Sequence, residues 1–341
     1  MIIPRIVSLL HTWSSGKRRK VTKENRKLKA RILLSLLLLF LCATTVDAAE
    51  LREITLGLVS PNWSTQLPIA VAQQAGFFKE EGVQAHSVTI ASGGTLMVAI
   101  LTSGHADLVI SGVAAIMRAI ARGAPVVVTS GVQTRIDYAL IGAKGLARVG
   151  DLRGKRVGVT SIGSFSEFAV IESLRRSGLI KDKDYTLLAA GGTVLRIGAL
   201  KAGKVDAIPL SSSERVAIEA EGFPVLQEVG GVLSEIPSSV LVAAKKFAAK
   251  DPETVIRFIR ALSKSMRLIK SDKEKAIQLA TAAKLKGNAE TQRKALDYYA
   301  ADLNVEIEKE SIVALLKALE LKGDPNDFFD RSYLVRAAAN R

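Results

Sequence analysis

Short apolar runs alternate with helix-like segments along residues 52–228. Ile54, Leu56 and Leu58 alternate with polar residues, a pattern typical of a strand, and a helical segment is expected over residues 68–78. Further strands and helices follow in the same alternation. Because short apolar strands that alternate with helices form parallel βαβ units, the pattern predicts a parallel sheet with helices on both faces.

The alternation occurs twice, and two stretches of sequence about 99 residues apart also resemble each other. The segment LTSGHAD at Leu101–Asp107 matches LKAGKVD at Leu200–Asp206, and Gly123–Val126 matches Gly222–Val225 at the same offset. This spacing is much longer than the ~20–50 residues of a solenoid repeat. Each copy is therefore expected to be a whole lobe.

A different pattern follows the second copy. One more strand is expected at Ser239–Ala243, and Asp251-Pro252-Glu253 supplies an N-cap acceptor, a proline at the first helical position and an acidic first turn. Apolar residues then recur at three- and four-residue steps from Val255 to Ile269, which predicts an amphipathic helix. This helical tail cannot bury its apolar face alone, so we expect it to pack on the first lobe.

The expected fold class is therefore α/β, with two lobes of mostly parallel sheet, flanking helices and a helical C-terminal tail. The expected boundaries are residues 49–138 with 242–341 for lobe 1, and residues 139–241 for lobe 2. The chain would cross between the lobes twice, near Tyr138–Gly142 and near Ser238–Val242. Two lobes joined by two extended crossovers form a hinge.

The charge of the chain is concentrated at its beginning. The formal net charge is +15, but the first 48 residues hold ten of the basic side chains against two acidic ones and so contribute +8. The rest of the chain is only mildly basic. This distribution argues against a nucleic-acid partner.

Residues 1–48 have the order of a secretory signal peptide. A basic segment precedes the apolar run Ile32–Leu41, and Val46-Asp47-Ala48 offers small residues for cleavage. The run is shorter than the roughly 20 residues of a membrane span. A permanent anchor and a twin-arginine signal at Arg18-Arg19 are alternatives, whereas lipidation of Cys42 is rejected because a bulky leucine precedes it. The expected location is the periplasm.

Polar and small residues recur at the expected carboxyl ends of the strands, where ligands bind in open α/β sheets. Turn formation or helix capping explains any one of them, but two lobes would aim them at one cleft. Glycines allow close approach of a ligand, and helix N-termini favour an anion or a polar head group. The candidate ligand-binding residues are Asn62, Trp63, Gly94, Thr95, Ser111, Ser161, Ser164, Phe165 and Ser211.

Two kinds of larger side chain add to this cleft. Trp63 and Phe165 are aromatic residues in strand-to-helix turns, where they either grip an apolar part of the ligand or pack against a neighbouring helix. Arg135 and Arg196 either neutralise an anionic ligand or pair with acidic residues of the protein.

Candidate catalytic residues are few, and we predict neither a catalytic residue, a metal site nor a cofactor. Cys42 is the only cysteine and would leave with the signal peptide, which excludes thiolate chemistry from the mature chain. His86 and His105 have no second ligand at metal-binding spacing. Asp107 and Asp206 occupy equivalent positions in the two copies, and each is interpreted as a helix-to-strand turn residue rather than an acid–base catalyst.

Four segments resemble bacterial solute-binding proteins of the two-lobed type II class. They are Ile69–Val83, which includes GFFKEEGV, Gly104–Asp107, DLRGKRVGV at Asp151–Val159, and Leu200–Ala207. The resemblance is strongest to taurine-, alkanesulfonate- and nitrate-binding proteins, relatives of the thiamine-pyrimidine synthases. It places cleft positions at seven of the candidate residues, all except Phe165 and Ser211, and at the turn after Leu210.

The resemblance implies a monomeric periplasmic receptor, not an enzyme, that delivers a small solute to an ABC permease. The expected solute is anionic or polar-headed, such as a sulfonate, nitrate, an aromatic acid or a pyrimidine-like molecule. The synthase relatives depend on a cysteine-rich motif and on histidine chemistry, and hydroxymethylbilane synthase needs a cysteine for its cofactor. A mature chain without cysteine departs from both. The alternative is a periplasmic enzyme acting in the same cleft.

Overall fold

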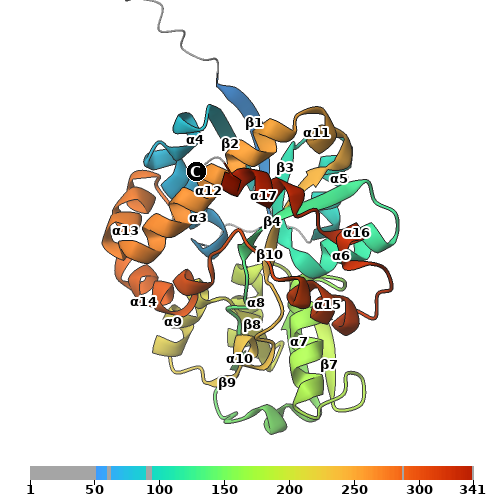
Figure 1. Cartoon of the computed structure of the whole chain (residues 1–341). Helices are drawn as coiled ribbons and strands as arrows, with labels where there is room; N and C mark the ends of the chain where they lie inside the picture. Colours follow the sequence, from blue (N-terminus) through green and yellow to red (C-terminus); the bar gives the residue numbers. More distant parts are fainter. Residues whose placement is uncertain (1–50, 60–62, 90–93, 286–287, 340–341) are drawn as a thin grey trace, which may run out of the picture. The chain divides into compact units, whose positions relative to one another are not determined.

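Two open five-stranded sheets with helices on their faces form the framework of residues 51–341 (Figure 1). The computed structural model describes residues 51–59, 63–89, 94–285 and 288–339. The expected leader, residues 1–48, and the candidate residue Asn62 lie outside the described residues. The α/β class and its two sheets are confirmed. The strands are β1 (Arg52–Leu58), β2 (Val83–Thr89), β3 (Leu108–Gly112), β4 (Val126–Gln133), β5 (Ala139–Gly142), β6 (Lys155–Val159), β7 (Tyr185–Ala189), β8 (Ala207–Leu210), β9 (Val225–Glu228) and β10 (Ser239–Ala244).

The helices follow the strands in the expected alternation and then continue into a helical tail. They are α3 (Trp63–Gln74), α4 (Phe77–Glu80), α5 (Gly94–Thr102), α6 (Val113–Ala121), α7 (Phe165–Arg176), α8 (Thr193–Lys201), α9 (Ser212–Ala220), α10 (Val229–Val232), α11 (Lys245–Lys250), α12 (Pro252–Ser271), α13 (Lys273–Ala282), α14 (Ala289–Tyr299), α15 (Lys309–Ala318), α16 (Pro325–Phe328) and α17 (Ser332–Ala339), with 3-10 turns η1 (Val149–Leu152) and η2 (Ala300–Asp302). In the described part of the chain, none of these helices is both long and apolar enough to cross a membrane.

The two sheets have the same topology. The first sheet has the strand order β2-β1-β3-β10-β4 and the second has the order β7-β6-β8-β5-β9. In each sheet, three neighbouring strands pair in parallel and the fourth, β10 or β5, pairs antiparallel with both of its neighbours. The sequence repeat therefore corresponds to a duplicated sheet.

The chain passes between the sheets twice, through residues 134–138 and residues 229–238. The sequence placed these crossovers a few residues later, at segments that the structure assigns to β5 and to the start of β10. A strand that follows a crossover starts at the edge where the parallel strands end. It must then run away from that edge, which explains why β5 and β10 are the antiparallel strands.

The two aspartates of the repeat make the same contacts in their respective sheets. Asp107 accepts a hydrogen bond from the backbone amide of Thr55 at 2.9 Å, and Asp206 accepts one from the backbone amide of Arg156 at 2.8 Å. Their own amides donate to the carbonyls of the same two partners, at 2.9 and 2.7 Å. Each aspartate thus ties a helix-to-strand turn to the first strand of its sheet, the structural role expected from the sequence.

The first helix begins earlier than its pattern suggests. We expected a start near Pro68, but α3 already begins at Trp63 and holds Pro68 in its interior. The residues of its first turn, Trp63 to Thr65, are buried, as is Leu67. Burial of this turn offsets the backbone hydrogen bond that the proline cannot donate. The extra turn brings Ser64 and Thr65 to the edge of the first sheet.

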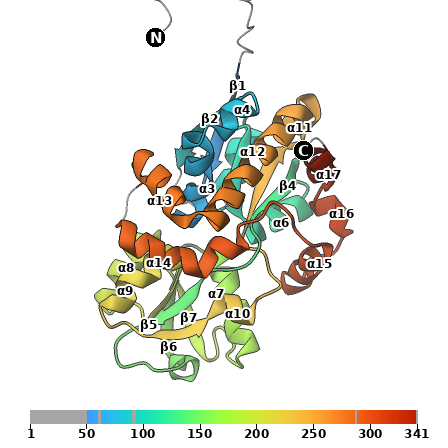
Figure 2. The ribbon, with the colours of Figure 1, turned by 60° about the vertical axis from the view of Figure 1, so that its left-hand side comes forward.

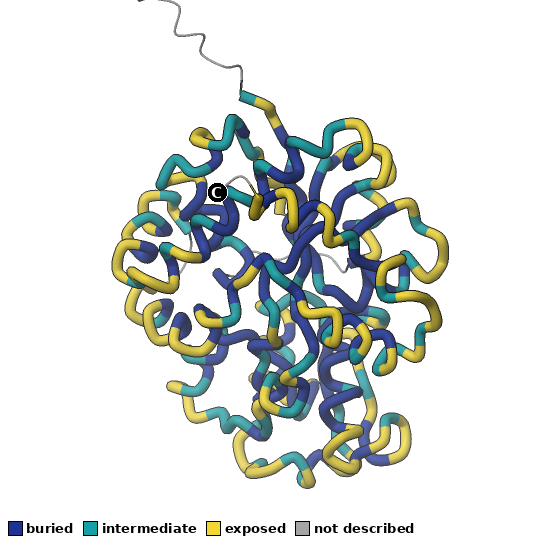
Figure 3. Tube along the Cα trace, in the orientation of Figure 1, coloured by how far each residue is buried: buried dark blue, intermediate teal, exposed yellow. Residues whose placement is uncertain are grey.

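The helical tail packs on both halves of the protein. Asp251 caps α12 by accepting from the amide of Thr254 at 3.2 Å, and the apolar face of α12 is buried as predicted. Helices α12 and α13 contact α3, whereas α14 contacts α9, which follows a strand of the second sheet (Figure 2). The expectation that the tail packs on the first lobe therefore describes α12 and α13 but not α14. Figure 3 shows buried chain running through both sheets.

Candidate functional site

A cavity of about 470 Å³ lies between the carboxyl ends of the strands of the two sheets. Val59 directly follows β1 and Gly112 ends β3 in the first sheet, while Thr160 follows β6 and Ser211 follows β8 in the second. All four line the cavity. Its volume falls within the ~300–1,000 Å³ of small-molecule sites. The strand-end argument therefore locates the cavity correctly.

Four of the nine candidate residues line this cavity, namely Gly94, Ser164, Phe165 and Ser211. Trp63 is buried in the apolar core, at 4% exposure, and the next two residues of α3 line the cavity instead. Thr95 in α5, Ser111 in β3 and Ser161 after β6 do not line it, and Asn62 lies outside the described residues.

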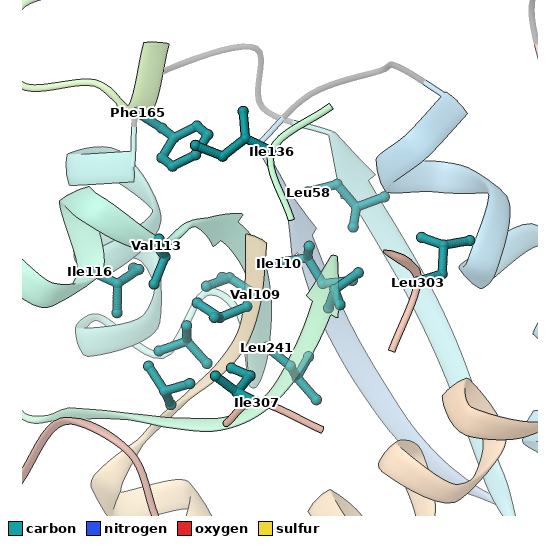
Figure 4. Close-up of a cluster of buried hydrophobic side chains, with 14 of the residues drawn as sticks. Leu58, Val109, Ile110, Val113, Ile116, Ile136, Phe165, Leu241, Leu303 and Ile307 are labelled. Carbon is teal, nitrogen blue, oxygen red and sulfur yellow. The ribbon is translucent and has the colours of Figure 1, made fainter. Parts of the chain in front are cut away.

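Phe165 joins the two sheets across the cavity. It begins α7, is 8% exposed, and packs edge-on against Tyr138 of the first crossover with 5.7 Å between ring centroids. Figure 4 shows its ring beside the side chain of Ile136. A Cβ atom on Gly112 of the first sheet would lie 2.6 Å from the Cβ of Phe165, so only glycine fits there. The two sheets are in contact at this point.

A hydrogen bond reinforces the same contact. Arg118 on α6 donates from Nη1 to the carbonyl of Gly163, which precedes α7, at 3.2 Å. This bond joins a helix that follows a strand of the first sheet to a turn of the second sheet. The two halves are therefore in contact beside the cavity, which is partly open to solvent.

A chain of hydroxyl groups forms one wall of the cavity. The Ser164 and Ser166 hydroxyls lie 3.0 Å apart, and Ser166 donates to Thr160 Oγ1 at 3.0 Å. Ser164 also caps α7 by accepting from the amide of Glu167 at 3.3 Å. Its capping role and its place in the cavity wall coexist, so the two interpretations of this residue are compatible.

Arg196 ends this chain of polar groups. It is 4% exposed, and its Nη1 donates to Thr160 Oγ1 at 2.5 Å and to the carbonyl of Gly191 at 2.9 Å. Its Nη2 lies 3.4 Å from both Thr193 Oγ1 and the carbonyl of Pro209. Burial lowers the pKa of the guanidinium. These neutral oxygens hold Arg196 at the cavity wall, and no described acidic residue forms an ion pair with it.

Asp137 and Glu214 are acidic residues of the cavity that the sequence analysis missed. Asp137 lies in the first crossover and is 8% exposed; burial raises its pKa to about 6, although the Ser212 amide at 3.2 Å opposes this by hydrogen bonding. Glu214 lies in the first turn of α9 and accepts a hydrogen bond from the Ser211 hydroxyl. Burial raises its pKa to about 7.

The sequence contains a recognisable pattern around one of these two acidic residues, Glu214. Ser211-Ser212-Ser213-Glu214 has the Ser-x-x-Glu spacing of a capping box, which places Glu214 in the first turn of a helix. This pattern also occurs at Ser164-Phe165-Ser166-Glu167. Asp137 had no such signal, because a single acidic residue in a linker has no pattern around it.

The cavity lining also includes exposed apolar side chains. Val194 and Leu195, in the first turn of α8, line the cavity and are 83% and 66% exposed. Large apolar side chains that remain accessible at a cavity are suited to contact an apolar part of a ligand. Together with Phe165, they give the cavity apolar lining beside its polar groups.

The remaining candidates lie elsewhere. Arg135 lies 3.9 Å from Asp302, so it faces an acid of the protein. His86 lies 3.7 Å from Glu53, and His105 contacts the Ser103 hydroxyl at 2.7 Å. Among the residues that the structure describes, no group of three metal-binding side chains occurs.

The sheets, crossovers and cavity together define the periplasmic-binding-protein fold. The alkanesulfonate-binding protein SsuA from Xanthomonas axonopodis pv. citri, solved with MOPS bound, matches 82% of this chain and 96% of its own, with a TM-score of 0.67 and 20% identity. The nitrate-binding protein NrtA from Synechocystis PCC 6803 matches 85% of this chain and 89% of its own, with a TM-score of 0.67 and 12% identity.

The family model described as NMT1/THI5 like matches residues 63–276. The chain belongs to the NMT1/THI5-like family. A curated relative, the 4-amino-5-hydroxymethyl-2-methylpyrimidine phosphate synthase of Saccharomyces cerevisiae, is 24% identical over 234 residues, which are 63% of this chain and 67% of the relative. The resemblance identified from the sequence is thereby confirmed.

Proposed function

We propose that this chain is the solute-binding receptor of an ABC import system. It closes on a small organic molecule and delivers that molecule to a membrane permease. The observation that carries the proposal is the cavity of about 470 Å³ between two sheets that are joined by two crossovers of the chain. A ligand that contacts both sheets binds the closed form better than the open one, and this difference in affinity drives closure.

The proposal also covers export, the hinge and the ligand contacts. Residues 1–48 serve as the export signal to the periplasm. The hinge lies at the two crossovers, residues 134–138 and 229–238, and separates the lobe of the first sheet from the lobe of the second. Each monomer binds one ligand, and the strand-end residues among the nine candidates surround that ligand or shape the turns that do. The fold neighbours with alkanesulfonate and nitrate in their names are consistent with a transported solute.

A second candidate function is an enzyme acting on a small molecule in the same cavity. Two observations favour it: curated relatives are named as pyrimidine phosphate synthases, and the cavity holds two carboxyl groups whose pKa values, about 6 and about 7, suit proton transfer near neutral pH. Against it, the only cysteine is Cys42, within the expected leader.

A ligand screen with recovery of the ligand separates the two. The protein from residue 49 onward is melted with sulfonates, nitrate, aromatic acids, amidines and aminopyrimidines. A compound at a hundred times its dissociation constant adds ~2.7 kcal/mol to the free energy of unfolding. The receptor predicts that the compound is recovered unchanged after long incubation. A turnover product contradicts the receptor and supports the enzyme.

A further inference from the structure

Helix α14 of the C-terminal tail is anchored to the first half of the protein along its side. Arg293 donates to both carboxylate oxygens of Glu274 in α13, at 2.5 and 2.7 Å. Lys273 at the start of α13 pairs with Asp297 of α14. Helix α13 in turn contacts α3, which follows the first strand of the first sheet. These ion pairs therefore place α14 with the first half.

Hydrogen bonds beyond the end of α14 hold it to the same half. The turn η2 follows α14 directly, and the carbonyl of Asp302 accepts from the amide of Thr134 at 2.8 Å and from its hydroxyl at 3.0 Å. The amide of Gly131 in β4 donates to the carbonyl of Val305 at 2.7 Å. The tail is thus tied to the end of β4, where the chain enters the first crossover.

The same helix also contacts α9, which packs on β5 and β8 of the second sheet (Figure 2). The guanidinium carbon of Arg215 in α9 lies 4.5 Å from the ring centroid of Tyr298 in α14. Arg215 is 4% exposed and is held on its own half by Glu219 and Glu228. Neither Arg215 nor Tyr298 lines the cavity. Helix α14 therefore joins the two halves at a place outside the cavity.

This contact differs from the two crossovers because no peptide bond runs through it. The crossovers, residues 134–138 and 229–238, can bend while the chain stays intact. A rotation about them carries α9 with the second sheet, so α9 must separate from α14 or slide against it. A noncovalent contact that a rotation breaks stabilises the orientation in which the contact forms.

We propose that α14 is a latch for the second half. It stays with the first half and holds α9 in the orientation in which Gly112 and Phe165 touch beside the cavity. A latch acts only if the halves move, so this inference rests on the proposed function. Tyr298 and Arg215 then set the balance between touching and separated halves without contacting a ligand. A cation–π contact at a partly exposed site shifts such a balance about two- to fivefold.

The latch also affects ligand affinity in a recognisable way. A ligand that contacts both sheets binds tightly only when the halves touch, so its apparent affinity scales with the fraction of protein in that orientation. A weaker latch therefore lowers the affinity by at most the same factor, and it does so alike for every ligand of the cavity. A residue that touches the ligand would instead discriminate between ligands.

Two spin labels measure the balance directly and need no ligand. They are attached at Val88→Cys in β2 and Leu188→Cys in β7, exposed positions on the outer strands of the two sheets. The full chain carries Cys42→Ser, which removes its only native cysteine. Pulsed electron paramagnetic resonance then gives the distance between the labels. We expect Tyr298→Ala to raise the ratio of the longer to the shorter distance about two- to fivefold.

Three further variants serve as controls for this measurement. Tyr298→Phe keeps the ring and should give the wild-type ratio. Lys264→Ala removes the ion pairs of α12 with Glu80 and Glu81, all within the first half, and should lower the stability without changing the ratio. Gly112→Val is the reference for separated halves and should give the longer distance. Because Tyr298 is 47% exposed, Tyr298→Ala leaves no hole in the core and should fold.

The outcomes separate the latch from the proposed function. If Gly112→Val lengthens the distance but Tyr298→Ala keeps the wild-type ratio, the latch is overturned and the receptor proposal stands. An equal rise of the ratio in Lys264→Ala and Tyr298→Ala also overturns the latch, because general destabilisation then explains the effect. One unchanged distance in every variant contradicts both the latch and a receptor whose halves move.

Discussion

The guanidinium carbon of Arg215 lies 4.5 Å from the ring centroid of Tyr298 and joins α9 to α14. Arg215 is itself fixed by Glu219 at 2.5 Å and by both carboxylate oxygens of Glu228 at 2.7 Å. Because α14 belongs to the C-terminal tail and α9 follows a strand of the second sheet, this contact is a connection between the halves in addition to the two crossovers.

Removal of the Tyr298 ring should loosen α14. A cation–π contact at a partly exposed site contributes ~0.5–1 kcal/mol, so Tyr298→Ala should lower the free energy of unfolding by about that amount and speed amide exchange in α14. Tyr298→Phe keeps the ring and should behave like the wild type. Equal exchange rates in all three proteins would show that the contact has no role in holding the helix.

A side chain at Gly112 should prevent closure without preventing folding. The backbone of Gly112, with φ −61° and ψ 131°, suits any residue, but a Cβ would lie 2.6 Å from that of Phe165. We expect Gly112→Val to weaken ligand binding at least tenfold and to give an open form in small-angle scattering. Gly198→Ala adds a Cβ where nothing lies within 4 Å and is the control. Undiminished affinity in Gly112→Val would contradict closure at this contact.

The buried carboxyl of Asp137 should make the unliganded protein less stable as the pH rises. Its pKa is about 6 in the folded protein, raised by burial from 3.8, so the folded state binds the proton more tightly than the unfolded chain. The stabilisation by protonation is present at low pH and is lost as the pH rises from about 4 to about 6, with a total of about 2–3 kcal/mol.

Asp137→Asn should remove this contribution, which is measured as the difference between variant and wild-type unfolding free energies at each pH. Taking the difference cancels the acids whose pKa is lowered by ion pairs, such as Glu81 and Glu172. A difference that stays constant from pH 4 to pH 8 would show that Asp137 does not titrate in this range.

The repeated aspartates should affect stability and not binding. Asp107→Ala and Asp206→Ala each leave a backbone amide of the first strand without its acceptor, at a cost of about 1–3 kcal/mol. Asp206→Ala should cost more, because Asp206 also receives Nε and Nη2 of Arg156, at 2.9 and 3.1 Å. Chemical denaturation measures both variants. A loss of ligand affinity at unchanged stability would instead place either residue in the binding site.

The duplicated sheets and the position of the cleft could be predicted because they depend on local patterns. Alternating apolar residues define the strands, the matching Gly-x-x-Asp turns define the repeat, and the ends of parallel strands meet at one edge. The antiparallel insertion of β5 and β10 could not be predicted, since their residues are as apolar as those of the parallel strands.

The chemistry of the cavity was harder to predict than its place. Ser164 and Ser211 were identified because residues after a strand and before a helix line such clefts. Asp137 lines the cavity through burial and tertiary packing, which a single sequence does not encode in a local pattern. Arg196 was a candidate, but its neutral oxygen partners come from tertiary packing. Trp63 was predicted to lie in a loop, but α3 begins at this residue and its ring lies in the core.

The receptor is tested most directly by a calorimetric titration of the folded chain at about pH 8 with a compound that the ligand screen identifies. Mass spectrometry then examines the compound recovered after the titration. The account predicts saturable binding of one molecule per chain, weakened at least tenfold in Gly112→Val, with the compound chemically unchanged. Conversion of the compound, or binding that Gly112→Val leaves untouched, would contradict a receptor that works by closing on its ligand.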